Sequence, residues 1–380
     1  MADFDYAVIG AGIAGASAAR ELQAHGRVLL LEGEALPGHH TTGRSAAFLI
    51  ESYGNEVVRR LTRASRPFFE EPPEGFADHP LIYERAALWI GREDQRRSLD
   101  SALETGRAAG IGLRPVCTEE ALEMCPVLRR DYLAAGVLEA DSIGIDVAGL
   151  LDANLRGLRT AGGVVRTRAR VTSLRQLREG WEIRAGAAVH RAEVVVNAAG
   201  AWCDEVAGLA GVRPLGLSPL RRTVITFDAP AGCDVRGWPY VIDVDEEFYF
   251  KPEGAQILAT PADETPSPPC DASAEEHDVA LAVDRVERAT TLEIKHIRNR
   301  WAGLRSFVRD RTPVIGMDAT HPGFFWLAGQ GGFGIMTSPA AARAAAGLIV
   351  DGTLPPDLAT LGLSADDLSP ERAALRRIAR

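Results

Sequence analysis

The sequence predicts an α/β protein with a second, mainly antiparallel domain. Its 380 residues exceed the usual size of one compact core. Residues 4–32 have the pattern of a strand, a helix and a second strand, and residues 213–260 alternate apolar and polar side chains between turns rich in proline and glycine. We therefore expect a parallel, helix-covered sheet and an antiparallel sheet in the same chain.

The opening unit is the clearest of the predicted elements. The run YAVIG at 6–10 is a short buried strand, and the segment up to Gly26 has helical apolar spacing, with this glycine as its stop. The run RVLLLE completes a second buried strand at Glu32. Together these elements predict a β-α-β unit.

Later segments continue the same two patterns. We expect a helix over 147–163, strands over 164–200 and a proline- and acid-rich loop over 261–276. Residues 323–352 predict a buried strand, a glycine-dense turn and an alanine-rich helix. Thr337 or Ser338 is the expected N-cap of this helix, with Pro339 at an early helical position.

Composition excludes several classes of protein. The chain is 46% hydrophobic and 25% charged, as globular proteins are, and its net charge of −10 argues against a nucleic-acid-binding face. No window reaches the length of a membrane span, and no signal peptide precedes the first strand, so we expect a cytoplasmic protein without stable membrane insertion. The five cysteines form no CxxC pair and predict free, small buried residues.

A metal site is not predicted. His39 and His40 are adjacent, but neither has a cysteine or an acidic partner at a ligand spacing along the chain. A polar loop is the favoured interpretation of this pair.

Gly10, Gly12 and Gly15 form a GxGxxG motif between the first strand and the first helix. The first glycine permits the tight turn, the second lets a pyrophosphate approach the backbone, and the third allows close packing of helix on strand. The helix N-terminus offers free N–H groups to phosphates, and Glu32 is placed to hold ribose hydroxyls. The motif predicts a dinucleotide cofactor without distinguishing NAD from FAD.

Three later turns favour FAD. The loop PGHHTTGRSAA follows the second strand and carries several hydrogen-bond donors, which suit a cofactor that extends past the pyrophosphate. A turn of small residues at 198–200 ends a buried strand. The glycine turn at 329–334 precedes a helix whose N-terminus would stabilise negative charge on a reduced flavin ring.

These segments, with VVNAAGAWCD and WAGLRSF, resemble the D-amino acid oxidase and sarcosine oxidase family of flavoenzymes, and within it the bacterial FAD-dependent D-arginine dehydrogenases most. The resemblance covers essentially the whole chain. It implies a discontinuous Rossmann-like FAD-binding domain at 1–82, 141–212 and 306–380, and a substrate domain on a mainly antiparallel sheet at 83–140 and 213–305. It also implies non-covalent FAD, since no cysteine follows Cys270.

The resemblance implies the residues of each site. The cofactor would contact the following positions: Gly10, Gly12, Ile13, Ala14, Gly15, Glu32, Gly38, Thr42, Arg44, Ser45, Ala46, Val171, Ala199, Gly200, Trp202, Gly303, Gly331, Gly334, Ile335 and Thr337. Arg222, Tyr249 and Arg305 would grip a substrate carboxylate, the Gly332 carbonyl would meet the substrate amine, and Tyr53 belongs to the same site. The residues themselves also suggest such a clamp, because an arginine in an apolar strand must be paired; a structural ion pair is the alternative.

The substrate pocket departs from that of the arginine-specific enzymes. The position aligned with their substrate-binding acid is Ala87, in the predicted strand HPLIYERAALWIG, and Glu84 would lie on the opposite face of this strand. Phe48 and Ile50 replace polar residues, and Tyr240 and Ile242 complete the expected pocket. A cationic side chain would be buried unpaired there, so we expect a preference for apolar D-amino acids.

The expected reaction is oxidative deamination of a D-amino acid to a 2-oxo acid and ammonia by hydride transfer to the flavin. A dehydrogenase that uses a quinone or another electron acceptor is favoured over an oxidase, because the stretch after FYFKP has no lysine, although Lys251 lies near. An oxidase or dehydrogenase of glycine, sarcosine or another N-substituted amino acid is the first alternative. A flavin-bearing binding protein without turnover is the second.

Overall fold

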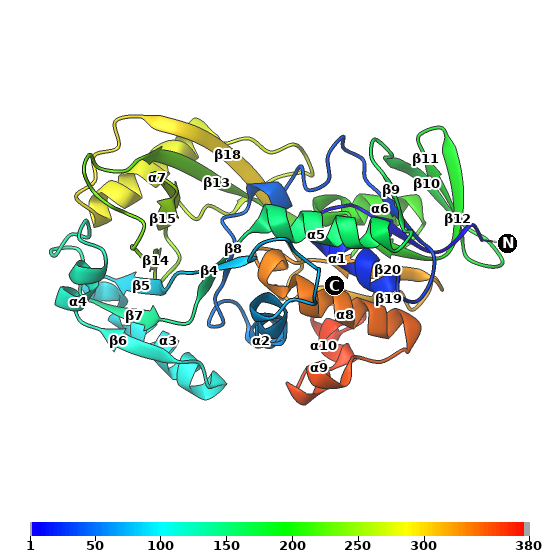
Figure 1. Cartoon of the computed structure of the whole chain (residues 1–380), viewed down its shortest axis with the longest axis horizontal. Helices are drawn as coiled ribbons and strands as arrows, with labels where there is room; N and C mark the ends of the chain where they lie inside the picture. Colours follow the sequence, from blue (N-terminus) through cyan, green and yellow to red (C-terminus); the bar gives the residue numbers. More distant parts are fainter. Residues whose placement is uncertain (1, 376–380) are drawn as a thin grey trace, which may run out of the picture.

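The computed structural model describes residues 2–375. Its first part is an eight-stranded sheet at the N-terminal side of the molecule (Figure 1). The central strands β1 (Phe4–Ile9), β2 (Val28–Leu31), β12 (Ala188–Asn197) and β20 (Phe324–Ala328) pair in parallel, and β9 (Val164–Arg166) continues the parallel set beyond β2. The edge strands β10 (Val171–Gln176), β11 (Trp181–Ala185) and β19 (Val314–Met317) are antiparallel.

Helices bury the apolar surfaces of this first sheet. On one face lie α1 (Ile13–Leu22), α5 (Val147–Thr160) and α8 (Gly334–Val350), and α2 (Glu56–Glu70) packs on α8. The short helix α6 (Cys203–Leu209) follows β12 and belongs to a separate core cluster with Trp181 and Trp326. The predicted β-α-β opening is therefore confirmed, and its parallel strands end together at one edge of the sheet.

The second part is a nine-stranded sheet in the order β17-β13-β16-β15-β14-β5-β7-β6, with β18 paired to β13. Its strands are β5 (Ala87–Gly91), β6 (Leu113–Val116), β7 (Ala135–Glu139), β13 (Ser218–Asp228), β14 (Tyr240–Asp243), β15 (Tyr249–Glu253), β16 (Gln256–Thr260), β17 (Thr265–Pro266) and β18 (Ile297–Phe307). All neighbours are antiparallel except β14 and β5. The helices α3 (Arg96–Ala109), α4 (Thr118–Met124) and α7 (Glu276–Ala289) pack on it.

A small sheet of β3 (Phe48–Leu49), β8 (Ile143–Ile145) and β4 (Ile82–Glu84) lies between the two parts. It corrects the prediction of one strand through HPLIYERAALWIG, because the chain leaves β4 after Glu84 and starts β5 in another sheet at Ala87. The argument that placed Glu84 and Ala87 on opposite faces of one strand is therefore wrong. Glu84 is exposed, and it lies outside the predicted substrate pocket because its strand belongs to a different sheet from that of Ala87.

Further elements differ from the prediction in detail. The helix α8 begins at Gly334 with Phe333 as N-cap, so Thr337, Ser338 and Pro339 lie inside it. The loop 261–276 contains the short strand β17, and α9 (Pro356–Thr360) and α10 (Ala365–Leu368) follow α8. The expected domain boundary at 305/306 falls inside β18, and the division into two domains stays a prediction.

The predictions for membrane spans and for cysteines can be compared with the fold. Within residues 2–375, no helix has the length and apolar content needed to cross a membrane. All five cysteines are free, but only Cys125 and Cys203 are buried, whereas Cys117 and Cys233 are exposed. The expectation of small buried cysteines is thus wrong for the exposed pair.

The turn between β19 and β20 depends on one carboxylate. Asp318, 8% exposed, accepts hydrogen bonds from the backbone N–H and hydroxyl of Thr320, from the backbone and ring of His321, and from Trp326 Nε1. Burial alone would raise the pKa of Asp318, but the hydrogen bonds from Thr320 and His321 outweigh it, so the pKa lies below its ordinary value.

We predict that Asp318→Asn lowers the free energy of unfolding by about 1–3 kcal/mol at neutral pH, because an amide cannot satisfy all of these donors. Because the folded pKa is lowered, the stabilisation is present above the unfolded pKa and is lost as pH falls through the folded one. The gap between wild type and variant, measured by urea unfolding, should narrow below about pH 4. A gap that stays constant with pH would contradict this.

Candidate functional site

The glycine motif packs β1, α1 and β12 against one another at distances that exclude side chains. Gly10 has a φ of 101°, and a Cβ there would lie 2.5 Å from the Ala198 carbonyl oxygen. A Cβ on Gly15 would lie 1.9 Å from the Gly10 carbonyl oxygen. Gly10 and Gly15 therefore have the turn and packing roles that the motif predicts. Gly15 is buried in this packing and is not exposed to a ligand.

The start of α1 is held by the two neighbouring loops. Thr42 Oγ1 accepts the N–H of Ile13 at 3.0 Å, and the Gly38 N–H donates to the Ala11 carbonyl at 3.1 Å. Glu32 accepts the N–H groups of Ala11 and Glu34, each at 2.8 Å. Its carboxylate thus braces the glycine loop, and each oxygen retains a second acceptor position for a ribose hydroxyl.

Three adjoining cavities run from this loop into the second sheet. The first measures about 460 Å³ and the second about 130 Å³, and they share Gly12, Thr42 and Gly200 in their walls. The third measures about 60 Å³ and shares Tyr249, Arg305 and Gly332 with the second. This continuity gives room for an elongated ligand with a second, smaller molecule at its far end.

Most of the predicted site residues line these cavities. The first contains Gly10, Glu32, Gly38, Val171, Ala199 and Trp202, and the second contains Ile13, Ala14, Arg44, Ser45, Ala46, Arg222, Gly303, Gly331, Gly334 and Ile335. The third contains Phe48, Ile50, Tyr53, Tyr240 and Ile242. The structure thus brings together residues that the sequence scatters over more than 300 positions.

Two further predicted residues line none of them. Thr337 is fully buried and its hydroxyl donates to the Phe333 carbonyl at 2.9 Å, inside α8. Ala87 is fully buried in the apolar cluster behind the third cavity, with Trp89 rather than Ala87 exposed to that cavity. Both predictions of direct ligand contact are corrected by the position of the residue in its element.

Arg44 also has a different role from the expected one. Its guanidinium donates to the carbonyls of Ala272 and Ala302 at 2.7 and 2.9 Å and pairs with Asp271, while Trp301 donates to the Arg44 carbonyl. This side chain therefore fastens the cofactor loop to the second sheet. The remaining atoms of Arg44 line the second cavity.

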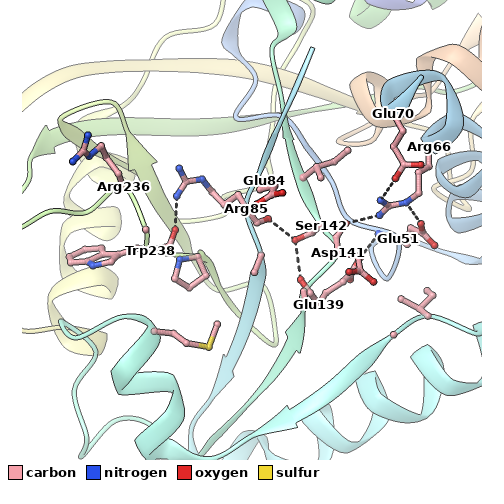
Figure 2. Close-up of a pocket in the computed structure, with 18 of the residues that line it drawn as sticks. Glu51, Arg66, Glu70, Glu84, Arg85, Glu139, Asp141, Ser142, Arg236 and Trp238 are labelled. Carbon is pink, nitrogen blue, oxygen red and sulfur yellow. Dashed lines mark hydrogen bonds and ion pairs between the residues drawn. The ribbon is translucent and has the colours of Figure 1, made fainter. Parts of the chain in front are cut away.

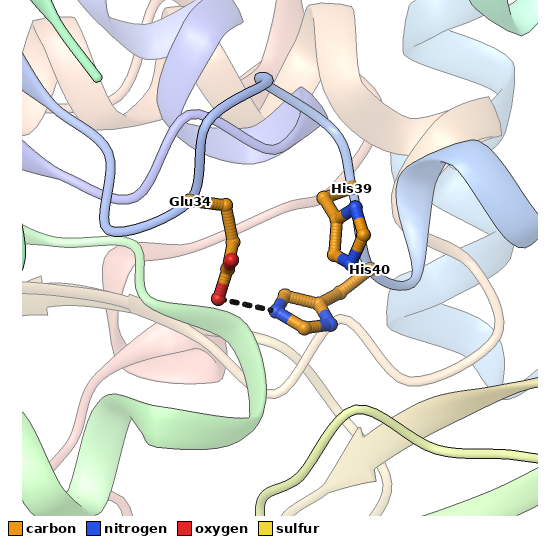
Figure 3. A group of neighbouring side chains, drawn as sticks. All are labelled: Glu34, His39 and His40. Atoms are coloured by element: carbon orange, nitrogen blue, oxygen red, sulfur yellow. Dashed lines mark hydrogen bonds and ion pairs between the residues drawn. The ribbon is translucent and has the colours of Figure 1, made fainter. Parts of the chain in front are cut away.

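The neighbouring histidines lie in a loop, as predicted, but they have acidic partners in space that their spacing along the chain did not indicate. His40 Nε2 lies 3.2 Å from Glu34 Oε1 (Figure 3). His39 Nε2 lies 3.5 Å from Asp271 Oδ2. The ligand atoms of Glu34, His39 and His40 lie within 4.8 Å of one another, and the His40 ring also packs on Trp202. The sequence could not reveal this group, because the chain reverses between Glu34 and His40.

Two arginines meet at the second cavity without full neutralisation. Arg222 on β13 donates through Nε to the Asp263 carbonyl at 2.9 Å and approaches Glu264 at 3.4 Å, whereas its buried Nη1 has no partner. Arg305 on β18 donates to the Tyr53 hydroxyl at 3.3 Å. Among residues 2–375, no carboxylate lies within ion-pair distance of Arg305.

The charge state of this cluster follows from burial. Burial alone would lower the pKa of Arg305, but the hydroxyls of Tyr53, Tyr249 and Tyr240 outweigh it and raise the pKa. Desolvation raises the pKa of Tyr53 and of Tyr240 above the usual range of a phenol. At neutral pH Arg305 is therefore cationic, whereas Tyr53 and Tyr240 are neutral, and such an environment attracts an anion.

The walls of the third cavity are mainly aromatic and aliphatic. The rings of Phe48 and Tyr240 stack with their centroids 4.1 Å apart, and Tyr240 meets Tyr249 edge to face at 5.1 Å. Sequence analysis missed Trp89 and Met336, whose spacing in a buried strand and a buried helix resembles that of ordinary core residues.

Glu246 is the charged residue that sequence analysis missed in this cavity. It lies in the turn between β14 and β15 with a φ of 57°, and it accepts the Tyr53 hydroxyl at 3.0 Å. Asp243, fully buried, accepts the N–H groups of Asp245 and Glu247 and so holds the turn. Glu246 itself is exposed, which places its carboxylate at the mouth of the cavity.

The second cavity also offers polar atoms that lack a protein partner. Ser306 Oγ and Gln330 Nε2 are buried without a hydrogen bond, as is Arg222 Nη1. Buried polar groups are normally satisfied, so these atoms indicate a ligand with several acceptors. The cavity residues therefore fit the polar ring of the predicted FAD, with the rest of the cofactor along the glycine loop.

Lys251 does not line these cavities. It is 4% exposed, pairs with Glu253 and lies with Nζ 5.3 Å from the centre of the Phe48 ring. Phe48 thus separates this lysine from the third cavity.

Comparison with known proteins agrees with this arrangement. The family model "FAD dependent oxidoreductase" (DAO) matches residues 5–348. FAD-dependent oxidoreductase domain-containing protein 1 of Xenopus laevis is 33% identical over 180 residues, which cover 42% of this chain and 35% of that protein. Mitochondrial sarcosine dehydrogenase of Mus musculus is 24% identical over 86% of this chain and 37% of its own length.

The solved structure of L-proline dehydrogenase from P. horikoshii superposes with a TM-score of 0.84 at 19% identity, covering 97% of both chains, and this likeness concerns the fold. The chain spans about half or less of the length of the curated relatives it matches. The family model nevertheless covers most of the sequence, including every residue that lines the three cavities, from Ile9 to Met336. The chain belongs to the DAO family of FAD dependent oxidoreductases.

Proposed function

We propose that this protein oxidises the amine of a D-amino acid with an apolar side chain and yields a 2-oxo acid and ammonia. The observation that carries the proposal is the pair of incompletely neutralised arginines, Arg222 and Arg305, at the junction of the second and third cavities. A buried charge without a partner is costly, so these groups require an anion when the site is filled.

A carboxylate suits this requirement better than an apolar ligand. A guanidinium is planar and donates two parallel hydrogen bonds to a carboxylate. Tyr249 shares the same wall and offers a hydroxyl beside Arg305. Gly332 lies flush against the Arg305 guanidinium, where a Cβ would be 2.8 Å from Arg305 Cζ, so no side chain covers this end of the clamp.

FAD, the cofactor of the family, supplies the electron-accepting ring when it is bound. The contribution of this chain is to hold the α-carbon in place and to exclude water. Among residues 2–375, no lysine or histidine lines the second or the third cavity, the raised pKa of Tyr53 keeps its hydroxyl protonated, and Glu246 lies exposed at the cavity mouth with its carboxylate bound by Tyr53. The substrate amine must therefore lose its proton before reaction, and the rate of flavin reduction should rise with pH as that amine is deprotonated.

The proposed preference for apolar side chains is based on the third cavity. Phe48, Ile50, Trp89 and Ile242 form its walls, and the position aligned with the arginine-specific acid is a methyl group covered by other side chains. Glu246 is the one acid in the lining, and it is exposed and engaged with Tyr53. A cationic side chain would therefore be stripped of water within apolar walls before it reached a partner.

The proposed electron acceptor is a quinone or another carrier rather than oxygen. The sarcosine-oxidase-type lysine that would activate oxygen has no counterpart here, since Lys251 is paired with Glu253 behind Phe48. Dehydrogenation is accordingly favoured over oxidase activity.

A second candidate function is oxidation of a secondary amine. Two of the proteins to which this chain is similar are named for sarcosine and L-proline, each of which has a secondary amine. The carboxylate clamp would serve such a substrate equally well, because the clamp does not contact the nitrogen.

We predict that Arg222→Met lowers kcat/KM about 10- to 100-fold, because hydrogen bonds to the carboxylate are lost. Arg221→Met is the matched control, since Arg221 pairs with Asp278 and Glu275 on the other side of the same strand. Steady-state kinetics with an electron-accepting dye compare the two variants. Equal losses for Arg221→Met and Arg222→Met would contradict the clamp.

The substrate class is tested by anaerobic reduction of the bound flavin. Apolar D-amino acids should bleach the flavin absorbance fastest, D-arginine slowly, and L-enantiomers least. N-methyl glycine and proline in the same panel test the second candidate. If D-arginine were fastest and Glu246→Gln selectively slowed it, the apolar reading of the pocket would be wrong.

A further inference from the structure

The loop that carries Tyr53 is anchored by a buried carboxylate outside the cavities. Glu139, at the end of β7, is 2% exposed. Its Oε1 accepts the backbone N–H of Glu51 at 2.7 Å, and its Oε2 accepts the N–H of Ser52 at 3.3 Å and the Ser52 hydroxyl. Tyr53 follows directly in the chain.

No cation balances this carboxylate. Among residues 2–375, no arginine, lysine or histidine forms an ion pair with Glu139, although it lines a groove of about 840 Å³ that also contains Arg66 and Arg85. Figure 2 shows these arginines committed elsewhere, Arg66 to Glu51 and Glu70, and Arg85 to the Trp238 carbonyl. The loop donors therefore supply the stabilisation that Glu139 receives.

Burial without a counter-ion is expensive, and desolvation raises the pKa of Glu139 despite the hydrogen bonds from Ser52 and Glu51. A neutral apolar residue would fill the same space more cheaply if only packing mattered. All three hydrogen bonds that the Glu139 carboxylate accepts come from the loop at Glu51 and Ser52. This indicates that the acid controls the position of that loop.

The loop in turn fixes the substrate end of the site. Tyr53 connects Arg305, whose Nη1 donates to its hydroxyl at 3.3 Å, with Glu246, which accepts from it at 3.0 Å. Its ring packs edge to face on Phe333 at 5.1 Å, beside the start of α8. A shift of the Glu51 and Ser52 backbone would therefore move the group that orients Arg305.

We propose that Glu139 is a positioning residue for the substrate pocket, acting through the backbone of Glu51 and Ser52 on Tyr53 and Arg305. This inference rests on the proposed function only for its kinetic consequence. It also explains an acid near the substrate pocket. Glu139 on β7 pairs directly with Ala87 on β5, and Ala87 is the position aligned with the substrate-binding acid of the arginine-specific enzymes. The hydrogen bonds direct this carboxylate to Glu51 and Ser52, and Glu139 does not line the third cavity.

The first test measures the anchor itself. In the FAD-loaded protein, Glu139→Ala should accelerate hydrogen exchange of the Glu51 and Ser52 amides about tenfold or more, since their acceptor is lost. Glu139→Gln, which keeps one acceptor oxygen, should give a smaller increase. Exchange in the middle of α2 should not change. Unchanged exchange at Glu51 and Ser52 in Glu139→Ala would overturn the proposal.

The second test measures the consequence for the pocket. Glu139→Gln should raise KM about tenfold with kcat within about threefold of wild type, because substrate positioning is lost while the cofactor stays in place. In a Tyr53→Phe background the effect of Glu139→Gln should fall below about threefold, because its route of action is gone. Asp318→Asn, a buried carboxylate that holds a remote turn, is the control for destabilisation alone and should leave KM unchanged.

Each outcome decides the proposal. An unchanged KM in Glu139→Gln, or an undiminished effect in the Tyr53→Phe background, would overturn it. If the wild type oxidises no amino acid, the proposed function fails instead. The positioning role is then decided by amide exchange and by the affinity for butanoate, a simple carboxylate, measured through the flavin absorbance: Glu139→Gln should weaken butanoate about tenfold.

Discussion

The structure of the site depends on two guanidinium groups brought close together on neighbouring strands. Arg222 and Arg305 lie near each other because β13 and β18 pair over their full length, with Arg222 opposite Gly303 and Arg305 opposite Leu220. Two cations at such a place repel each other and lose hydration. The surrounding carbonyl of Asp263, the carboxylate of Glu264 and the hydroxyl of Tyr53 offset part of this cost, and a bound anion must offset the rest.

The two sheets have different tasks around this pair. The parallel sheet ends in glycine and alanine turns whose backbone approaches so closely that Gly10 and Gly15 admit no side chain. The antiparallel sheet instead presents large side chains of fixed orientation. The segment 43–54 joins the two: Ser45 and Ala46 line the second cavity, and Phe48, Ile50 and Tyr53 line the third. A single loop therefore forms part of the walls of both the second and the third cavity, so its anchoring affects both.

Local patterns predicted much of this arrangement and failed where tertiary contacts decide. The glycine motif and the first strands were predictable because spacing and residue type alone constrain them, whereas the two arginines were selected through the resemblance to the flavoenzyme family. The start of α8 was placed at the polar residues Thr337 and Ser338, which are in fact satisfied inside the helix by the carbonyls of Phe333 and Ile335. The break between β4 and β5 was not predicted because no glycine or proline marks it in the sequence around Arg85 and Ala86.

Glu246 and Glu139 were missed for a related reason. Glu139 lies at the end of a strand and Glu246 lies in a turn, where acids are common, and only the fold shows what each carboxylate contacts. The histidine pair illustrates the same limit, since Glu34 and Asp271 reach it by chain reversal and from a distant loop. Contacts between segments far apart in sequence are the part of a site that periodicity cannot encode.

The lack of charge inside the third cavity depends on where the neighbouring acids lie rather than on how many there are. One acid adjoins Ala87 from the next strand, but the N–H groups of Glu51 and Ser52 occupy it. Glu246 lies at the mouth of the third cavity in a left-handed turn, and its carboxylate accepts the Tyr53 hydroxyl. Neither leaves an acceptor inside the apolar walls. A pocket with a cationic end and an uncharged interior therefore results from where the carboxylates of these acids are bound.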